Sequence, residues 1–257
     1  MLPQVNIIRA NNGDFLSFFE QKGISDVLTA CGAWDELTIA LARTLVDITD
    51  LPPVIMDIGA NMGTFTVPLG KHVAPRGGKV HSFEPQKIVF YQLCGNTFLN
   101  RLDNVSTYNM ALSSTNEFRE IPRMNFDTAW NIGAYSLVPN QDPQQKLETK
   151  EPCEFRKLDD FELPSRITLI KLDIEGMEIE VLSGAMNRIA RDGFPPILFE
   201  SLEADPRSAQ VKELLTAAGY KLLQYANEDW LAQHGDWPTE INLINGETGI
   251  MGYVRVR

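Results

Sequence analysis

The sequence has few of the residues that build disulfide frameworks, zinc sites or membrane spans. Its three cysteines, Cys31, Cys94 and Cys153, lie far apart without Cys-x-x-Cys spacing, which argues against a disulfide framework and a zinc site. No stretch approaches the roughly 20 apolar residues of a membrane span. The first residues also lack the basic start and apolar run of a secretion signal. We therefore expect a cytoplasmic protein with reduced thiols.

Basic residues are also in short supply. The 257 residues include 23 lysines and arginines against 34 aspartates and glutamates, which gives a net charge of −11. An acidic surface repels a phosphate backbone, and no basic run with interleaved aromatic residues is present. The composition argues against a nucleic-acid partner.

One segment of the chain carries the strongest positive signal. An apolar run at residues 54–58 leads into a turn with Gly59 and Gly63, and a second run, which begins at Lys79, delivers Glu84 at the end of a predicted strand. This order predicts strand, tight turn, helix and strand, with an acid at the end of the second strand. The glycines let the backbone approach a ligand closely, and Glu84 is placed to accept hydrogen bonds from a ribose diol. The segment predicts a site for a nucleoside-containing cofactor, the alternative being a turn with a structural role only.

The dinucleotide fingerprint is incomplete in this segment. That fingerprint needs three glycines in Gly-x-Gly-x-x-Gly, the middle one clearing space for a pyrophosphate. Here the middle position is Asn61, and no third glycine follows. S-adenosylmethionine carries adenosine and an amino-acid tail but no phosphate, so it fits the segment better than NAD does.

The hydrophobic pattern alternates between strand and helix along most of the chain. This alternation predicts an α/β fold with a mostly parallel sheet that helices cover on both faces. The last two predicted strands, residues 220–225 and 252–256, have no convincing helix between them, which favours an antiparallel final strand. Single predicted helices cover residues 34–48 and 177–191.

We expect one domain over residues 1–257. Residues 1–50 predict a hairpin and a helix ahead of the first core strand, and residues 113–158 interrupt the alternation with a polar, proline-containing insertion. Loops of that length are usually functional. The insertion is therefore expected near the active site.

The candidate site lies at the carboxyl ends of the predicted strands, where open α/β sheets bind their ligands. The residues at or just after these ends are Asp57, Glu84, Met110, Ala111, Asp173, Glu175 and Glu200. The acids among them would repel one another unless a cation, such as a sulfonium or a metal ion, lies between them. For each acid alone, the alternative is a helix cap or a solvated loop end.

Three blocks carry a specific family resemblance. Asp57-Ile58-Gly59-Ala60-Asn61-Met62-Gly63, Phe83-Glu84-Pro85, and the Lys-x-Asp-x-Glu-Gly-x-Glu run that begins at Lys171 resemble the motifs of the FkbM family of S-adenosylmethionine-dependent methyltransferases. Residues 33–36 and 131–137 resemble two lesser blocks. The resemblance covers about residues 30–203, and the third block is its most specific part.

The resemblance implies a class I methyltransferase fold with a seven-stranded, mostly parallel sheet. It also implies methyl transfer to a hydroxyl oxygen of a sugar or another small hydroxylated metabolite. The implied cofactor residues are Asp57, Gly59, Ala60, Asn61 and Gly63 at the methionine end, Glu84 and Pro85 at the ribose, and Met110 and Ala111 at the adenine.

Methyl transfer to a hydroxyl requires loss of a proton from a weak acid, which a base or a metal ion assists. Asp173 and Glu200 end neighbouring predicted strands and are the candidates for the base, with Glu175 and Asn131 as polar neighbours. Carboxylate and amide oxygens would equally suit Mg²⁺. Both alternatives stay open at this point.

Two irregular segments are predicted to form the acceptor pocket. They are residues 125–137 and the tail around Trp230, His234 and Trp237, which offer hydrogen bonds and flat apolar faces to a polyol. The alternative is that these aromatic residues only fasten long loops. The other functions considered are N-methylation, methylation of a glycan on a larger carrier, and a catalytically silent cofactor-binding partner.

Overall fold

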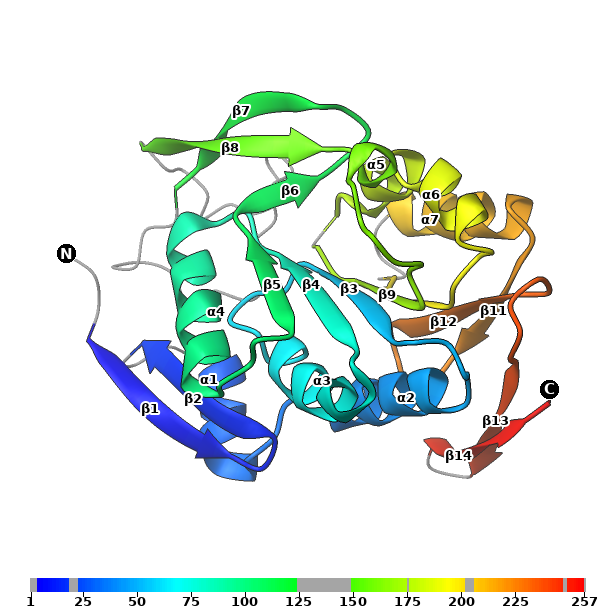
Figure 1. Cartoon of the computed structure of the whole chain (residues 1–257), viewed down its shortest axis with the longest axis horizontal. Helices are drawn as coiled ribbons and strands as arrows, with labels where there is room; N and C mark the ends of the chain where they lie inside the picture. Colours follow the sequence, from blue (N-terminus) through cyan, green and yellow to red (C-terminus); the bar gives the residue numbers. More distant parts are fainter. Residues whose placement is uncertain are drawn as a thin grey trace.

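The computed structural model describes residues 4–18, 23–123, 149–174, 176–201, 206–246 and 249–256. A seven-stranded sheet with the order β11-β12-β10-β9-β3-β4-β5 runs through the centre of the molecule (Figure 1). Only β12 runs antiparallel to the other six strands. The predicted α/β fold with one antiparallel strand is confirmed. The strands are β3 (Val54–Ile58), β4 (Lys79–Phe83), β5 (Val105–Tyr108), β9 (Leu169–Leu172), β10 (Ile197–Glu200), β11 (Tyr220–Gln224) and β12 (Asp229–His234).

The order of the strands reverses at β3. The chain continues from β3 to β4 and β5 on one side, and later adds β9 and β10 on the other side. A crevice forms at such a reversal, outside the carboxyl ends of the strands, and is where ligands of open α/β sheets bind. The topology therefore places a ligand-binding edge beside β3 and β9.

Helices cover both faces of the sheet. Ile55, Leu169 and Leu198 pack beneath α2 (Glu36–Asp47) and α3 (Thr66–Val73). Their chain neighbours Met56 and Ile170 point the other way, as successive strand residues do. That second face packs against α5 (Glu178–Ser183), α6 (Met186–Arg191) and α7 (Pro206–Ala217).

The first 50 residues contain the predicted hairpin and helix, with one further helix. β1 (Val5–Ala10) and β2 (Gly13–Phe18) pair antiparallel, and α1 (Ile24–Cys31) follows them ahead of α2. The hairpin is fastened to α4 (Lys87–Leu99), because Gln92 Nε2 donates to the Leu16 carbonyl and Asn96 Oδ1 accepts from the Leu16 amide. The sequence did not predict α1.

The described ends of the predicted insertion form strands rather than loops. β7 (Glu117–Pro122) and β8 (Lys150–Arg156) join β6 (Met110–Leu112) in a three-stranded sheet, drawn at the top of Figure 1. Alternate residues of β8, Cys153 and Phe155, are buried. The sequence did not predict β8, because its alternating pattern is short and lies between polar stretches.

Two predictions about element boundaries were wrong. The predicted strand 252–256 does not close the main sheet, since residues 252–255 lie in β14 (Gly249–Arg255), which pairs with β13 (Ile241–Gly246) in a separate hairpin. The single helix predicted over residues 177–191 is divided into α5 and α6 at Gly184. A side chain at Gly184 would lie 2.0 Å from the Ser113 carbonyl oxygen, so this break allows two backbone segments to touch.

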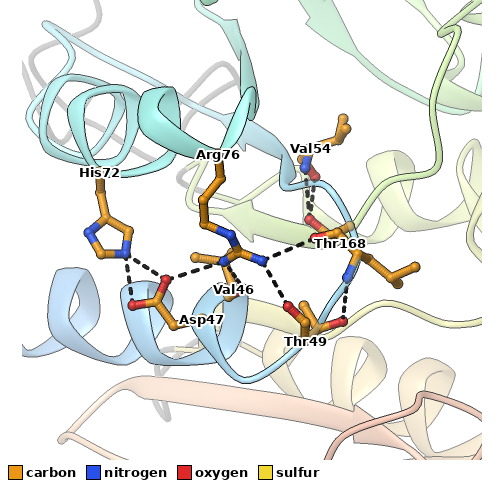
Figure 2. Close-up of polar contacts among 8 residues, drawn as sticks. Val46, Asp47, Thr49, Val54, His72, Arg76 and Thr168 are labelled. Carbon is orange, nitrogen blue, oxygen red and sulfur yellow. Dashed lines mark hydrogen bonds and ion pairs between the residues drawn. The ribbon is translucent and has the colours of Figure 1, made fainter.

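Hydrogen bonds tie together the amino end of the sheet. Figure 2 shows Arg76, in the 3-10 helix η1 (Ala74–Arg76), donating to the Val46 carbonyl at 2.7 Å and the Thr49 carbonyl at 2.8 Å. Thr168 exchanges hydrogen bonds of 3.0 and 2.8 Å with the Val54 backbone, which joins the starts of β9 and β3. Within the described residues, no helix has the length and apolar character to cross a membrane.

The first prediction concerns the contact between Gly59 and β9. A Cβ at Gly59 would lie 1.8 Å from the Asp173 carbonyl oxygen, and its φ is +83°. Gly59→Ala should therefore lower the free energy of unfolding by more than about 3 kcal/mol, measured by urea denaturation. Gly77 is the matched control, because it also has a positive φ of +67° but open space around its Cβ position. Gly77→Ala should cost only about 1–2 kcal/mol, and equal costs would contradict the contact.

Candidate functional site

Alternation along the strands brings the polar strand-end residues onto one face of the sheet. Side chains two positions apart in a strand share a face. One apolar residue in each of four strands is buried beneath α2 and α3. The polar residue two positions away in the same strand therefore lies on the same face. These polar and apolar residues are Asp57 with Ile55, Lys171 with Leu169, Glu200 with Leu198, and Asp229 with Leu231.

A cavity of about 360 Å³ lies at this edge of the sheet. It is lined by strand-end residues and by residues from α1, α2 and the segment between them. Four of the lining residues are acids, Asp35, Asp173, Glu200 and Asp229, whereas Lys171 is the only cation among the described residues that line it. The remaining lining residues are Val27, Trp34, Thr38, Leu172, Leu198, Phe199 and Tyr225.

Lys171 connects the cavity to the turn after β3. Its ammonium lies 3.0 Å from Asp173 Oδ2 and 3.7 Å from Asp57 Oδ1, and it donates to the Gly59 carbonyl at 3.3 Å. Burial opposes the charge of Lys171, but the attraction of Asp173 and Asp57 outweighs burial and raises its pKa. The ammonium therefore stays charged at any physiological pH.

Asp57 is completely buried below the turn. Burial raises its pKa, while Lys171 and the Thr66 hydroxyl, which donates to Oδ2 at 2.5 Å, act in the opposite direction. Oδ1 of Asp57 accepts no hydrogen bond from the described part of the chain. A buried carboxylate oxygen with spare acceptor capacity is therefore present next to the turn.

The turn itself is fixed to the end of β4. The amides of Gly59 and Ala60 both donate to the Phe83 carbonyl, at 3.1 and 2.9 Å. Asn61 adopts a φ of +50°, and its amide donates to Glu84 Oε2 at 3.0 Å. The turn after β3 and the acid after β4 thus form one hydrogen-bonded unit.

Glu84, the acid of that unit, is buried directly after β4. Its Oε1 also accepts from the Gln86 amide at 2.8 Å, yet burial outweighs both backbone donors and raises the pKa of Glu84 to about 7. Asn109 donates to the carbonyls of Glu84 and Pro85 at 2.9 and 3.0 Å. Since Met110 and Ala111 follow Asn109, the residues predicted to bind the cofactor lie together at this edge. Their individual roles stay predictions.

Asp173 and Glu200 line the same cavity, as expected for neighbouring strand ends. Glu175, Asn131 and residues 125–137 lie outside the described residues. Among the residues that the structure describes, no three His, Cys, Asp or Glu side chains are grouped so that they could hold a metal ion. The magnesium alternative finds no support there.

The prediction for the aromatic tail was wrong, because the tail forms β12. Trp230 lies on the opposite face of the sheet from the cavity, packed with the α5–α7 cluster, and Lys212 Nζ sits 3.9 Å from its ring centroid. His234 pairs with Tyr220 at the amino edge and stacks on Phe194. Trp237 is buried near the same edge, beneath Arg166.

Sequence reasoning missed several residues of the cavity wall, among them Asp229, Trp34 and Asp35. Asp229 begins β12, a segment that was assigned to an irregular tail. Trp34 and Asp35 were noted only as part of a family block, and both line the cavity. Asp35 precedes α2 with a φ of +49° and makes no side-chain cap. Such an unusual backbone conformation often accompanies a functional position.

Comparison with known proteins agrees with this geometry. The family model described as the methyltransferase FkbM domain matches residues 57–222. The chain belongs to the FkbM family. The predicted resemblance is confirmed, and the seven-stranded sheet is the class I methyltransferase fold that it implied.

Individual relatives are distant from this FkbM-family chain. Methyltransferase sdnD from Sordaria araneosa is 27% identical, covering 68% of this chain and 77% of its own. The tRNA(Phe) (4-demethylwyosine(37)-C(7)) aminocarboxypropyltransferase from Methanocaldococcus jannaschii is 32% identical over 28% of each chain. The crystal structure of methyltransferase FkbM from Methylobacillus flagellatus KT has a TM-score of 0.48 and 18% identity, covering 72% of this chain and 45% of that chain. The chain thus spans less than half of the archaeal transferase and of the Methylobacillus protein.

The second prediction tests the buried charge on Lys171. Lys171→Met leaves two carboxylates without their shared cation and should cost about 3–5 kcal/mol of unfolding free energy. Asp57→Asn combined with Lys171→Met should cost clearly less than the sum of the two single changes. Lys221→Met is the control, because its pair with Glu240 is exposed and should be worth about 0–1 kcal/mol. Additive costs in urea denaturation would contradict the coupling.

Proposed function

We propose that this protein is an S-adenosylmethionine-dependent methyltransferase that acts on a hydroxyl of a sugar or another small hydroxylated metabolite. The observation that carries the proposal is the contact between two parts of the site. The glycine turn and Glu84 lie directly beside an acidic cavity, joined through Lys171, at the reversal point of the sheet. Methyl transfer requires the methyl donor and the acceptor to bind in two adjacent sites such as these.

The residues of the turn suit this cofactor. Glu84 provides a buried carboxylate for a ribose diol, and Asp57 provides a buried oxygen with spare acceptor capacity. Asn61 occupies the position where a pyrophosphate would need a glycine. When bound, S-adenosylmethionine supplies a methyl group activated on a positively charged sulfur. The acids around the turn favour such a charge.

The cavity suits a small polar acceptor. Its volume of about 360 Å³ is in the range of small-molecule sites. Trp34 and Tyr225 offer aromatic faces, while Thr38 and Tyr225 share a hydrogen bond of 3.0 Å between their hydroxyls. The acids can accept hydrogen bonds from acceptor hydroxyls and orient them. Four acids against one cation disfavour a phosphorylated or carboxylated acceptor.

The same charge balance supports one alternative within the class. An amine acceptor would be attracted as an ammonium ion to the acids of the cavity, and the reaction would then be N-methylation. Incubation with methyl-labelled S-adenosylmethionine and matched pairs of sugars and amino sugars separates the two reactions, because mass spectrometry locates the label on oxygen or nitrogen. A glycan on a larger carrier would be recognised by label that stays with macromolecules. A cofactor-binding partner without activity would bind the cofactor and label nothing.

The third prediction concerns the cofactor. S-adenosylhomocysteine should bind and NAD should not, in calorimetry at pH 8, where the Glu84 carboxylate is ionised. Glu84→Ala should weaken binding by roughly 1–3 kcal/mol, because the ribose hydroxyls lose a charged acceptor. Since the pKa of Glu84 is about 7, the affinity of the wild type should fall as the pH drops from 8 to 6.

Glu84 also holds the amides of Asn61 and Gln86, so the melting temperature of Glu84→Ala has to be measured in parallel. Glu120→Ala removes an exposed glutamate from β7 and serves as the control. Tight binding of NAD, or an unchanged affinity in folded Glu84→Ala, would contradict the prediction.

The fourth prediction concerns the acids of the cavity. Asp173→Asn and Glu200→Gln should each lower turnover at least about tenfold while leaving the affinity for S-adenosylhomocysteine nearly unchanged, because they line the acceptor cavity. Asp103→Asn, an exposed change ahead of β5, should alter neither quantity. Wild-type turnover in both cavity variants would exclude both acids from the chemistry. Loss of activity with EDTA and recovery with Mg²⁺ would assign them to a metal ion instead.

A further inference from the structure

Asp229 differs from Asp173 and Glu200 in its place along the strand. Asp229 begins its strand, whereas Glu200 ends β10 and Asp173 directly follows β9, since β12 runs antiparallel to its neighbours. Its Cα is paired with that of Glu200 in the register of β10 and β12. The amides of Tyr225 and Ala226 donate to the Asp229 carbonyl at 3.0 and 3.4 Å, which closes the turn between β11 and β12. The backbone of Asp229 is thus fixed at the wall of the cavity.

The charges around Asp229 set it apart from Asp173. Asp173 lies 3.0 Å from the Lys171 ammonium and forms an ion pair with it. Within the described residues, Asp229 has no cation within 4.0 Å. The charged groups around it are Asp35 before α2, Lys171 of β9, Asp173 directly after β9, Glu200 of β10, and Glu228 beside it in the chain.

We propose that Asp229 is the general base of methyl transfer, an assignment that rests on the proposed function. The acceptor O–H bond breaks and its proton moves to a carboxylate oxygen of Asp229. The acceptor oxygen forms its new bond to the methyl carbon, while the electrons of the methyl–sulfur bond remain on sulfur. The acceptor leaves as a methyl ether, and the cofactor product is a neutral thioether. Asp229 then returns its proton to solvent.

The protonation behaviour of Asp229 supports this role. Burial, followed by the negative charges of Asp35, Asp173 and Glu228, raises the pKa of Asp229 to about 6. A general base is most effective when its pKa lies close to the working pH. Asp229 is therefore ionised at neutral pH, and is a stronger base than an exposed aspartate. Lys171, which lowers this pKa, contributes less than the acids.

The first arm of the test needs no acceptor. Carboxyl carbons of aspartate are labelled with ¹³C in the intact protein, and NMR titration follows them from pH 4 to pH 8. One resonance should titrate near pH 6 and be missing in Asp229→Asn. In Asp173→Asn its midpoint should move to lower pH, because a neighbouring negative charge is gone. An Asp229 resonance that titrates below pH 4.5 would overturn the assignment.

The second arm measures methyl transfer against pH. The probe acceptor is the sugar or amino sugar that takes up most label in the paired screen. Wild-type turnover should rise with pH through about 6 and then level off. Asp229→Asn should lose this rise and about 10²- to 10⁴-fold of turnover at neutral pH, while S-adenosylhomocysteine affinity and melting temperature stay nearly unchanged. Asp229→Glu should restore part of the rate, and Asp173→Asn should keep the rise at a lower midpoint.

Glu228→Gln is the matched control, since it removes one negative charge from the neighbouring exposed position and should keep the rise in rate. Wild-type methyl transfer together with an unchanged pH profile in Asp229→Asn would overturn the base assignment alone. A wild-type protein that binds no S-adenosylhomocysteine would overturn the proposed function, and the assignment with it.

Discussion

The site depends on the Lys171 ammonium, a single positive charge buried among acids. It lies within 4 Å of Asp57 on one side and Asp173 on the other, and it also reaches the carbonyl of Gly59. Without it, the acids below the turn and along the cavity would face each other in a low-dielectric environment, and some would take up protons. Lys171 thus allows the turn after β3 and the acidic cavity to share one edge of the sheet.

Much of the fold was predictable because its signals are local. The strands β3, β9 and β10 are short, mostly apolar runs that adjoin glycine, proline or an acid, and β4 lies between Gly78 and Glu84. The helix α2 has helical spacing of its apolar residues. β12 was missed because its sequence does not alternate between polar and apolar residues, and its Trp230 and His234 resemble an aromatic loop when the partner strands are unknown. The break at Gly184 was missed because its cause is the Ser113 carbonyl, about 70 residues away along the chain.

Some residues of the candidate site were likewise predictable from the sequence, and others were not. Asp57, Glu84, Asp173 and Glu200 lie at or directly after the ends of predicted strands, so the sheet rule correctly brought them to one edge. Asp35 and Asp229 reach the cavity from a helix start and an antiparallel strand, which that rule does not cover. Lys171 lies inside a strand and reads as part of a family motif, and only the three-dimensional distances reveal that it joins two neighbouring sites.

Because Gly59 contacts the Asp173 carbonyl, the residues that line the cavity are not equally free to change during evolution or design. The wall formed by β9 touches the cofactor turn directly, so any change of shape there is transmitted to the turn. Trp34, Asp35, Thr38 and Tyr225, which also line the cavity, come from other segments of the chain. The shape of the cavity can therefore be redesigned, or can diverge among relatives, at these residues while the turn after β3 keeps its geometry.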